Sequence, residues 1–254
     1  MNCTDLDTPR LLPLGDSAWT VEFADRIDPA IHGRVMALEA LVADARHRDP
    51  VLACVIDLVP TFRSLTVHFD ARASDPQVLG QRLLSLAANA ASSEIGGRHW
   101  RLPACFDADL APDLAMVAER HGTNTHDVVD LLCQTRFRVY MIGFMPGFPY
   151  MGGLPASLHT PRLATPRKVV PARSIAIAGE MCAVYPWQSP GGWNLLGSTP
   201  LPLFSAHESV PALLASGDFV SWQAVDRTTY QQIEADFAQG QCRREDFLSQ
   251  GELR

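Results

Sequence analysis

Hydrophobic and polar positions follow two different periods over the first 95 residues of the chain. Runs with a period of two predict strands, and apolar stripes at helical spacing predict helices. Two segments, Asp28-Pro29 and Ser74–Gln77, have a capping residue ahead of a first-turn proline. The predicted elements are a strand over 18–23, a helix after Asp28, a buried strand over 51–58, a strand over 65–69 and a helix after Ser74. This β-α-β-β-α order predicts a small α+β domain over residues 1–95.

Residues 92–97 are small and polar and end in two glycines, which predicts a linker at the domain boundary. Strand and helix patterns return on its C-terminal side. The predicted elements there are a strand over 99–106, short helices over 112–121 and 125–134, a strand over 219–222 and a helix over 228–237.

Between Gly143 and Pro202 the chain changes character. These 60 residues hold 8 glycines and 10 prolines, a density at which no helix of normal length persists. Aromatic and β-branched residues stand between the breakers, as in the strand predicted over 174–178. Short strands between tight turns are typical of a small barrel, so residues 96–254 are predicted to form a mainly-β barrel domain.

Composition and charge exclude several classes of function. The chain has 254 residues, of which 28 are acidic and 21 basic, so its net charge is −7. Nucleic-acid-binding proteins usually carry a basic excess. The longest apolar run of the first half, Val51–Ile56, is far shorter than the ~20 residues that cross a bilayer, and the acidic N-terminus lacks the apolar core of a signal peptide. We therefore expect a cytoplasmic protein that binds neither nucleic acid nor membrane.

The sequence offers no metal site and no familiar cofactor motif. The six cysteines lie at least 28 residues apart, and the nearest histidines, His121 and His126, fall on different helix faces. Neither a G-x-x-x-x-G-K-[ST] loop nor a G-x-S-x-G elbow occurs. We therefore expect no metal and no cofactor bound by this chain alone, and reduced thiols.

One region of this acidic chain is basic. Between Met141 and Ala206 the charged residues sum to +3, and they are Arg162, Arg167, Lys168, Arg173 and Glu180. Arginine binds carboxylate or phosphate through two parallel hydrogen bonds, so the region predicts a site for a small anion. The alternative is that these side chains are solvated or bind loop carbonyls.

Two rigid loops stand out in the same region. The first, residues 143–155, spaces its aromatic side chains so that they share one face, and these are Phe144, Phe148 and Tyr150. It predicts the wall of a ligand cleft or an aromatic plug at a barrel corner. The second, Ser189–Trp193, contains Gly191-Gly192, whose amides predict either an oxyanion-binding turn or a tight hairpin.

These loops carry a long motif that resembles the KipI-like family, also called allophanate hydrolase subunit 1-like. The matching runs are residues 143–155, His159–Arg162, Thr165–Arg167, Val170–Ala172, Ser174–Gly179, Tyr185-Pro186, Ser189–Gly197 and Thr199–Leu201. A weaker likeness covers nearly the whole chain. The resemblance implies a cyclophilin-like β-barrel after the small α+β domain.

Members of that family include the B subunit of bacterial ATP-dependent 5-oxoprolinase and an inhibitor of a sporulation histidine kinase, and related sequence forms part of the carboxyltransferase region of urea carboxylases. The resemblance implies one component of a complex that opens an amide, converting 5-oxoproline, ATP and water to glutamate. It also implies two partners, a KipA-like barrel protein similar to the C subunit of 5-oxoprolinase and a protein similar to the A subunit of that enzyme. The alternative is a non-catalytic regulator that binds and inhibits a sensor histidine kinase.

The chain departs from the family pattern in the expected pocket. Leu132 stands where the family usually has histidine, Met181-Cys182 replaces Gln-Thr, and Arg173 replaces glycine. Three polar groups are thus lost from the expected pocket wall, which predicts an altered substrate.

The residues expected to bind a small anionic substrate lie in the two loops and the basic region. They are Phe144, Pro146, Phe148, Tyr150, Arg162, Arg167, Arg173, Glu180, Tyr185, Gly191, Gly192 and Trp193. The sequence assigns no catalytic residue.

Overall fold

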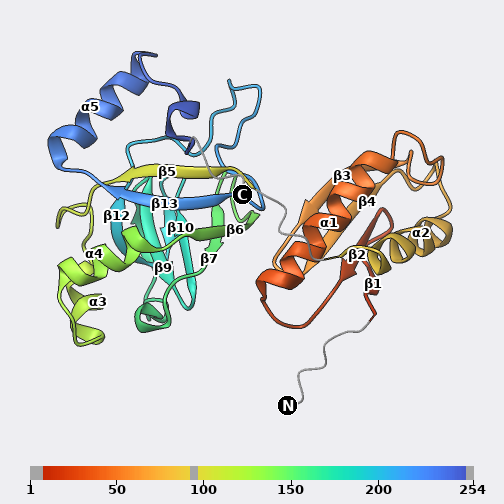
Figure 1. Cartoon of the computed structure of the whole chain (residues 1–254), viewed down its shortest axis with the longest axis horizontal. Coiled ribbons are helices and arrows are strands. Elements are labelled where there is room, and N and C mark those ends of the chain that lie inside the picture. Colours follow the sequence, from red (N-terminus) through yellow and green to blue (C-terminus); the bar gives the residue numbers. More distant parts are fainter. Residues whose placement is uncertain (1–7, 92–96, 250–254) are drawn as a thin grey trace. The chain divides into compact units, whose positions relative to one another are not determined.

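The computed structural model describes residues 8–91 and 97–249. The chain divides into two compact units, Met1–Ile95 and Gly96–Arg254, and each has its own hydrophobic core. Most of the predicted linker lies outside the described residues. Figure 1 shows one sheet with two helices in the first unit and a curved sheet with surrounding helices in the second.

The first unit is a four-stranded antiparallel sheet with two helices. Its strands lie in the order β1 (Arg10–Pro13), β2 (Ala18–Glu22), β4 (Ser64–Phe69) and β3 (Val55–Pro60). Helices α1 (Pro29–Ala45) and α2 (Pro76–Ala88) contact each other and the sheet. Apolar side chains of both helices and of the sheet form one buried cluster, which includes Val21, Leu38, Leu65 and Leu83.

The structure differs from the predicted strands of this unit in two ways. Strand β1 is an additional strand, and its mostly exposed side chains leave no alternating pattern in the sequence. The strand predicted over 51–58 is wrong in its start and in its burial. Residues 51–54 form a turn, and Ile56 in β3 is 66% exposed.

Aspartate side chains cap the N-termini of both helices of this unit. Asp28 caps α1 as predicted, because its carboxylate accepts a hydrogen bond from the Ala30 amide at 2.7 Å. The predicted N-cap of α2 is wrong by one residue. Asp75, not Ser74, accepts the Gln77 amide at 2.8 Å, since a carboxylate is at least as good an acceptor at this position.

The second unit is built on a seven-stranded sheet that nearly closes on itself. The strand order is β12 (Asn194–Ser198), β9 (Ser174–Ala178), β10 (Met181–Val184), β7 (Pro149–Gly152), β6 (Phe137–Ile142), β13 (Phe219–Ala224) and β5 (His99–Ala104). The two edges meet where Cys105 and Ser198 exchange backbone hydrogen bonds of 2.9 and 3.0 Å. The predicted barrel is thus confirmed as a barrel-like sheet in a mixed α/β fold.

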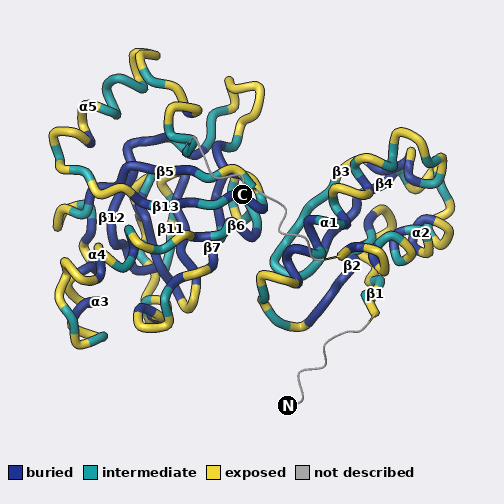
Figure 2. The backbone as a smooth tube through the Cα atoms, in the orientation of Figure 1, coloured by how far each residue is buried: buried dark blue, intermediate teal, exposed yellow. Residues whose placement is uncertain are grey.

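Helices and a short ribbon surround this sheet. They are α3 (Leu114–Arg120), α4 (Thr125–Gln134), α5 (Arg227–Ala238), the 3-10 turns η1 (Ala156–Leu158) and η2 (Arg244–Phe247), and the paired strands β8 (Arg167–Val170) and β11 (Ser189–Gly191). Figure 2 shows buried backbone along the barrel strands and exposed backbone at the connecting loops. No helix within the described ranges is long and apolar enough to cross a membrane.

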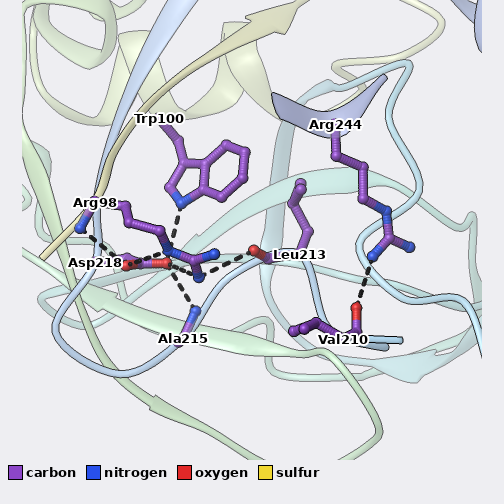
Figure 3. A network of polar contacts seen from close by, with 7 residues as sticks. All are labelled: Arg98, Trp100, Val210, Leu213, Ala215, Asp218 and Arg244. Atoms are coloured by element: carbon purple, nitrogen blue, oxygen red, sulfur yellow. Dashed lines mark hydrogen bonds and ion pairs between the residues drawn. The ribbon is translucent and has the colours of Figure 1, made fainter. Parts of the chain in front are cut away.

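A buried carboxylate joins the first strand of the second unit to β13. Asp218 accepts hydrogen bonds from the Arg98 amide and guanidinium, from the Trp100 indole at 3.0 Å and from the Ala215 amide at 2.9 Å. Figure 3 shows these donors converging on the two carboxylate oxygens. The network fixes β5 beside β13, the one parallel pair of the seven-stranded sheet.

Candidate functional site

The loop between β6 and β7 holds an aromatic side chain in an uncommon backbone conformation. Phe144 has φ +67°, and its side chain is 67% exposed. Gly147 in the same loop has φ +79°, and a Cβ there would lie 2.7 Å from Cβ of Phe204. A non-glycine residue in the left-handed region costs roughly 1–2 kcal/mol. The fold therefore holds a large apolar side chain outward at an energetic cost.

Five aromatic rings meet beneath this loop. Phe148 is at the centre, with ring centroids at 4.9 Å from Tyr150, 5.2 Å from Tyr185, 5.4 Å from Phe144 and 5.9 Å from Trp193. The contacts are edge-to-face, the arrangement that aromatic pairs prefer. The predicted grouping of the loop aromatics on one face is therefore observed, and Tyr185 and Trp193 join it from the other loops. We call these five residues the aromatic cluster.

The aromatic cluster lies outside the barrel core. Met151 and Cys182 oppose each other in β7 and β10 and both belong to the core, whereas their neighbours Tyr150 and Ala183 oppose each other on the other face. Strand β11 of the β8–β11 ribbon comes close to the aromatic cluster at Tyr185. A Cβ on Gly191 would lie 2.3 Å from the Tyr185 hydroxyl, so only glycine allows the ribbon to approach this closely.

Arg162 lies at the solvent-accessible edge of the aromatic cluster. The guanidinium of Arg162 lies 5.9 Å from the Trp193 ring centroid, and Arg162 itself is exposed. Phe148, Tyr185 and Trp193 are buried, while Phe144 is exposed and Tyr150 is half-buried. A ligand can therefore reach Phe144, Tyr150 and Arg162, and the other three rings support them.

Both tyrosine hydroxyls of the cluster hold their protons strongly. Burial raises the pKa of Tyr150, and the positive charge of Arg162 only partly offsets this effect. Burial also raises the pKa of Tyr185, against a smaller lowering by the Trp193 backbone amide, which donates to its hydroxyl oxygen. At neutral pH both groups are therefore neutral phenols that can donate a hydrogen bond.

Arg167 occupies a different place from Arg162. Its Nη2 donates to Oδ1 of Asp113 at 2.6 Å, and the other oxygen of Asp113 accepts the Leu195 amide at 2.7 Å. Both side chains are mostly buried. Arg167, which was predicted to bind a ligand, is thus paired with Asp113 within the fold. This ion pair connects β8 to the start of α3.

Arg173 is also paired within the fold. Its φ is +69°, and its guanidinium binds Glu234 and donates to the Pro200 carbonyl at 2.9 Å. Glycine adopts this left-handed backbone without strain, which fits the glycine expected here from the family resemblance. Glu180 lies exposed at the turn between β9 and β10, next to Gly179 with φ +58°.

The remaining predicted residues lie near the aromatic cluster. The Gly192 carbonyl accepts the Leu163 amide at 2.7 Å, which holds the segment of Arg162 against the turn before Trp193. The carbonyl of Pro146 accepts the indole N–H of Trp187 at 3.3 Å. The oxyanion role of the Gly191-Gly192 amides stays a prediction.

Two of the departures from the family pattern lie in the barrel core. Leu132 and Cys182 are completely buried members of that core, so the expectation that these two side chains line the pocket is wrong. Met181 is buried at the start of β10 and, by the alternation of the strand, shares the face of Ala183 rather than that of Cys182. The altered substrate stays a prediction.

One of these departures leaves a donor poorly paired. The indole Nε1 of Trp222 is buried, lies near the Cys182 thiol and has no partner with ordinary hydrogen-bond geometry among the described residues. Burial raises the pKa of this thiol to about 12, so it is a neutral and weak acceptor.

Cys182→Thr, which restores the usual family residue, should raise the free energy of unfolding by about 1 kcal/mol, because a hydroxyl oxygen accepts the Trp222 N–H better than a thiol does. Chemical denaturation of the whole chain measures this. Cys182→Val is the matched control, since valine has the shape of threonine without the acceptor. An equal gain from valine would show that packing, not hydrogen bonding, is responsible.

Several residues around the site have no obvious signal in the sequence. Asp113, the partner of Arg167, is 54 positions away from it along the chain. Trp187 and Phe204 pack with ring centroids 5.9 Å apart beside Gly147. Trp187 follows the matching Tyr185-Pro186 run directly, which is the one hint of its location. No cluster of three or more possible metal ligands occurs among the described residues.

Comparison with known proteins identifies the family. The model of the carboxyltransferase domain, subdomain C and D, matches residues 9–214. The chain is 35% identical over 228 residues to the B subunit of 5-oxoprolinase from Bacillus subtilis, covering 85% of this chain and 93% of that protein. It is 42% identical over 168 residues to the B subunit of 5-oxoprolinase from Haemophilus influenzae, covering 66% of this chain and 78% of that protein.

Solved structures share the fold. The crystal structure of TTHA0988 superposes with a TM-score of 0.69 at 32% identity, and the match covers 82% of this chain but only 40% of that longer chain. The urea amidolyase of Kluyveromyces lactis superposes with a TM-score of 0.71 at 20% identity, over 92% of this chain and 16% of that one. At that identity the second likeness concerns the fold alone.

Proposed function

The chain belongs to the carboxyltransferase domain family, subdomains C and D, and on that premise we propose that it is the B subunit of a 5-oxoprolinase-like complex. The observation that carries the proposal is its identity of 34–42% to three proteins that are B subunits of 5-oxoprolinase. A complex of this kind is expected to be cytoplasmic. The relatives reported above do not support the regulatory alternative, inhibition of a sensor histidine kinase.

The aromatic cluster suits 5-oxoproline as a ligand. This molecule is a five-membered lactam ring that carries one carboxylate. In our proposal its carboxylate binds the guanidinium of Arg162, and its ring lies against Phe144 and Tyr150. A charge-assisted hydrogen bond orients the ligand, and the aromatic faces bury its apolar atoms.

The Tyr150 hydroxyl fits the chemistry of lactam opening. Opening a stable amide places negative charge on the carbonyl oxygen, and neutral donors held in a partly buried site stabilise that charge. Tyr150 is such a donor, because burial raises its pKa and keeps the phenol neutral. We assign it the role of stabilising the lactam oxygen, while ATP, bound by the complex rather than by this chain alone, supplies the driving force.

The proposal requires further proteins. The match to TTHA0988 leaves most of that longer chain uncovered, which supports an assembly with further domains. We propose two partners, a barrel protein similar to the C subunit of 5-oxoprolinase and a protein similar to its A subunit. Co-purification of the three proteins tests this assembly.

Arg162→Ala should weaken the binding of 5-oxoproline by about 1.5–3 kcal/mol, or roughly 10- to 150-fold in Kd, because one charge-assisted contact is lost. Titration calorimetry of the assembled complex measures the change. The matched control is Arg120→Ala, which removes an exposed arginine of α3. If Arg162→Ala binds 5-oxoproline as tightly as the wild type does, the guanidinium of Arg162 does not bind the carboxylate, and this part of the proposal is wrong.

A further inference from the structure

One arginine of the second unit, Arg244, is almost completely buried. Arg244 opens the η2 turn and is 8% exposed. Its Nη1 donates to the carbonyls of Val210 and Pro211 at 3.0 and 3.2 Å. Figure 3 shows the guanidinium reaching from η2 to the loop that carries Val210.

The other two nitrogens of this guanidinium lack acceptors. Nε and Nη2 of Arg244 are both buried and have no hydrogen-bond partner in the part of the chain that the structure describes. These two N–H groups lie on one edge of the planar guanidinium and point the same way. That edge matches the two oxygens of a carboxylate or a phosphate.

Neighbouring carboxylates do not fill this edge. Both oxygens of Asp218 accept from Arg98, Trp100 and Ala215, and Figure 3 draws no contact from Asp218 to Arg244. Asp246 accepts the Arg243 amide at 2.8 Å. Glu245 is exposed. A buried cation with two unpaired donors is among the costliest arrangements in a protein, and an oxyanion is the partner that this edge of the guanidinium fits.

We propose that the Nε–Nη2 edge of Arg244 is a binding site for a small oxyanion of the carboxylate or phosphate class. The loop that covers the guanidinium lies at the surface, because residues 206–211, which include the two carbonyl partners, are all exposed. A hollow of about 360 Å³ lies at the other end of η2 and is lined by Arg101, Gln223 and residues 246–249.

The site is distinct from the aromatic cluster, and its failure would leave the proposed function unaffected. Its test is thermal unfolding of the full chain at constant ionic strength, with chloride replaced by acetate or by phosphate. The wild type should melt about 2–4 °C higher in at least one of the two anions, because a ligand that binds only the folded state stabilises it. Acetate and phosphate in separate series distinguish the two anion classes.

Arg244→Lys keeps the charge but removes the two-donor edge, so the anion-dependent rise should disappear, whereas the exposed neighbour Arg243→Lys should keep it. If Arg244→Lys does not fold, arginine-selective ¹⁵N spectra of the wild type provide the test. One Nε–H signal protected from exchange should shift as acetate or phosphate is added.

Two results would overturn the proposal. The first is a wild-type melting temperature that is the same in all three anions. The second is an equal rise in wild type and Arg244→Lys, or a protected Nε–H signal that does not move.

Discussion

Asp218→Ala should lower the free energy of unfolding of the second unit by about 3–5 kcal/mol, the usual cost of removing one partner from a buried charge network. The side chain of Asp218 is only 5% exposed. Its removal leaves the Trp100 indole and the Ala215 amide without an acceptor, and it leaves the Arg98 guanidinium without its counter-charge. The parallel pair β5–β13 depends on these contacts, so the loss should be global.

Urea denaturation of the second unit within the full chain measures this loss. Asp226→Ala is the matched control, since Asp226 is an exposed aspartate of the same unit that caps α5 through one 2.7 Å hydrogen bond from Thr229. Loss of such a cap costs about 1 kcal/mol. Equal losses from the two substitutions would mean that the Asp218 network contributes no more than an ordinary helix cap.

Arg167→Ala should cost about 2–3 kcal/mol of stability, in contrast to Arg162→Ala, which should change stability little. Asp113 keeps the Leu195 amide but loses its cation, and its carboxylate is 10% exposed. Removing one member of a buried pair leaves the other charge uncompensated. We place the cost below the usual range because the Arg167 side chain is 28% exposed, so that solvent partly screens the pair.

A double-mutant cycle separates the pair from other effects. If the ion pair is responsible, Asp113→Ala combined with Arg167→Ala should cost clearly less than the sum of the two single substitutions. Strict additivity would show that the two side chains act independently. The cycle also distinguishes a structural arginine from a ligand-binding one, since only Arg162→Ala should change the affinity for 5-oxoproline.

Local patterns were enough to predict most elements of the fold. The helix over 125–134 matches α4, because one face of that helix meets the core and its period is therefore visible. The strand over 174–178 matches β9, whose five residues are all buried and read as a short apolar run between turn residues. Strand β1 was missed because an exposed edge strand has no such period. The run 51–58 was misleading, because residues 51–54 are apolar and yet form a turn.

The candidate site was predictable only in part. The loop motif predicted that Phe144, Phe148 and Tyr150 gather, and they do. Which face of β10 holds Cys182 depends on its register with Met151, which the sequence does not reveal. The pairing of Arg167 with Asp113 depends on the packing of distant segments, so charge alone could not separate Arg167 from Arg162.

ATP-dependent formation of glutamate from 5-oxoproline tests the proposed function directly, with this chain reconstituted together with its two proposed partners, the proteins similar to the A and C subunits of 5-oxoprolinase. We expect turnover in the common enzyme range of ~1–10³ s⁻¹ for the complete complex, and none for this chain alone or for the complex without it. A complete, stable complex that hydrolyses no 5-oxoproline would show that the proposed function is wrong, and so would turnover by this chain without its partners.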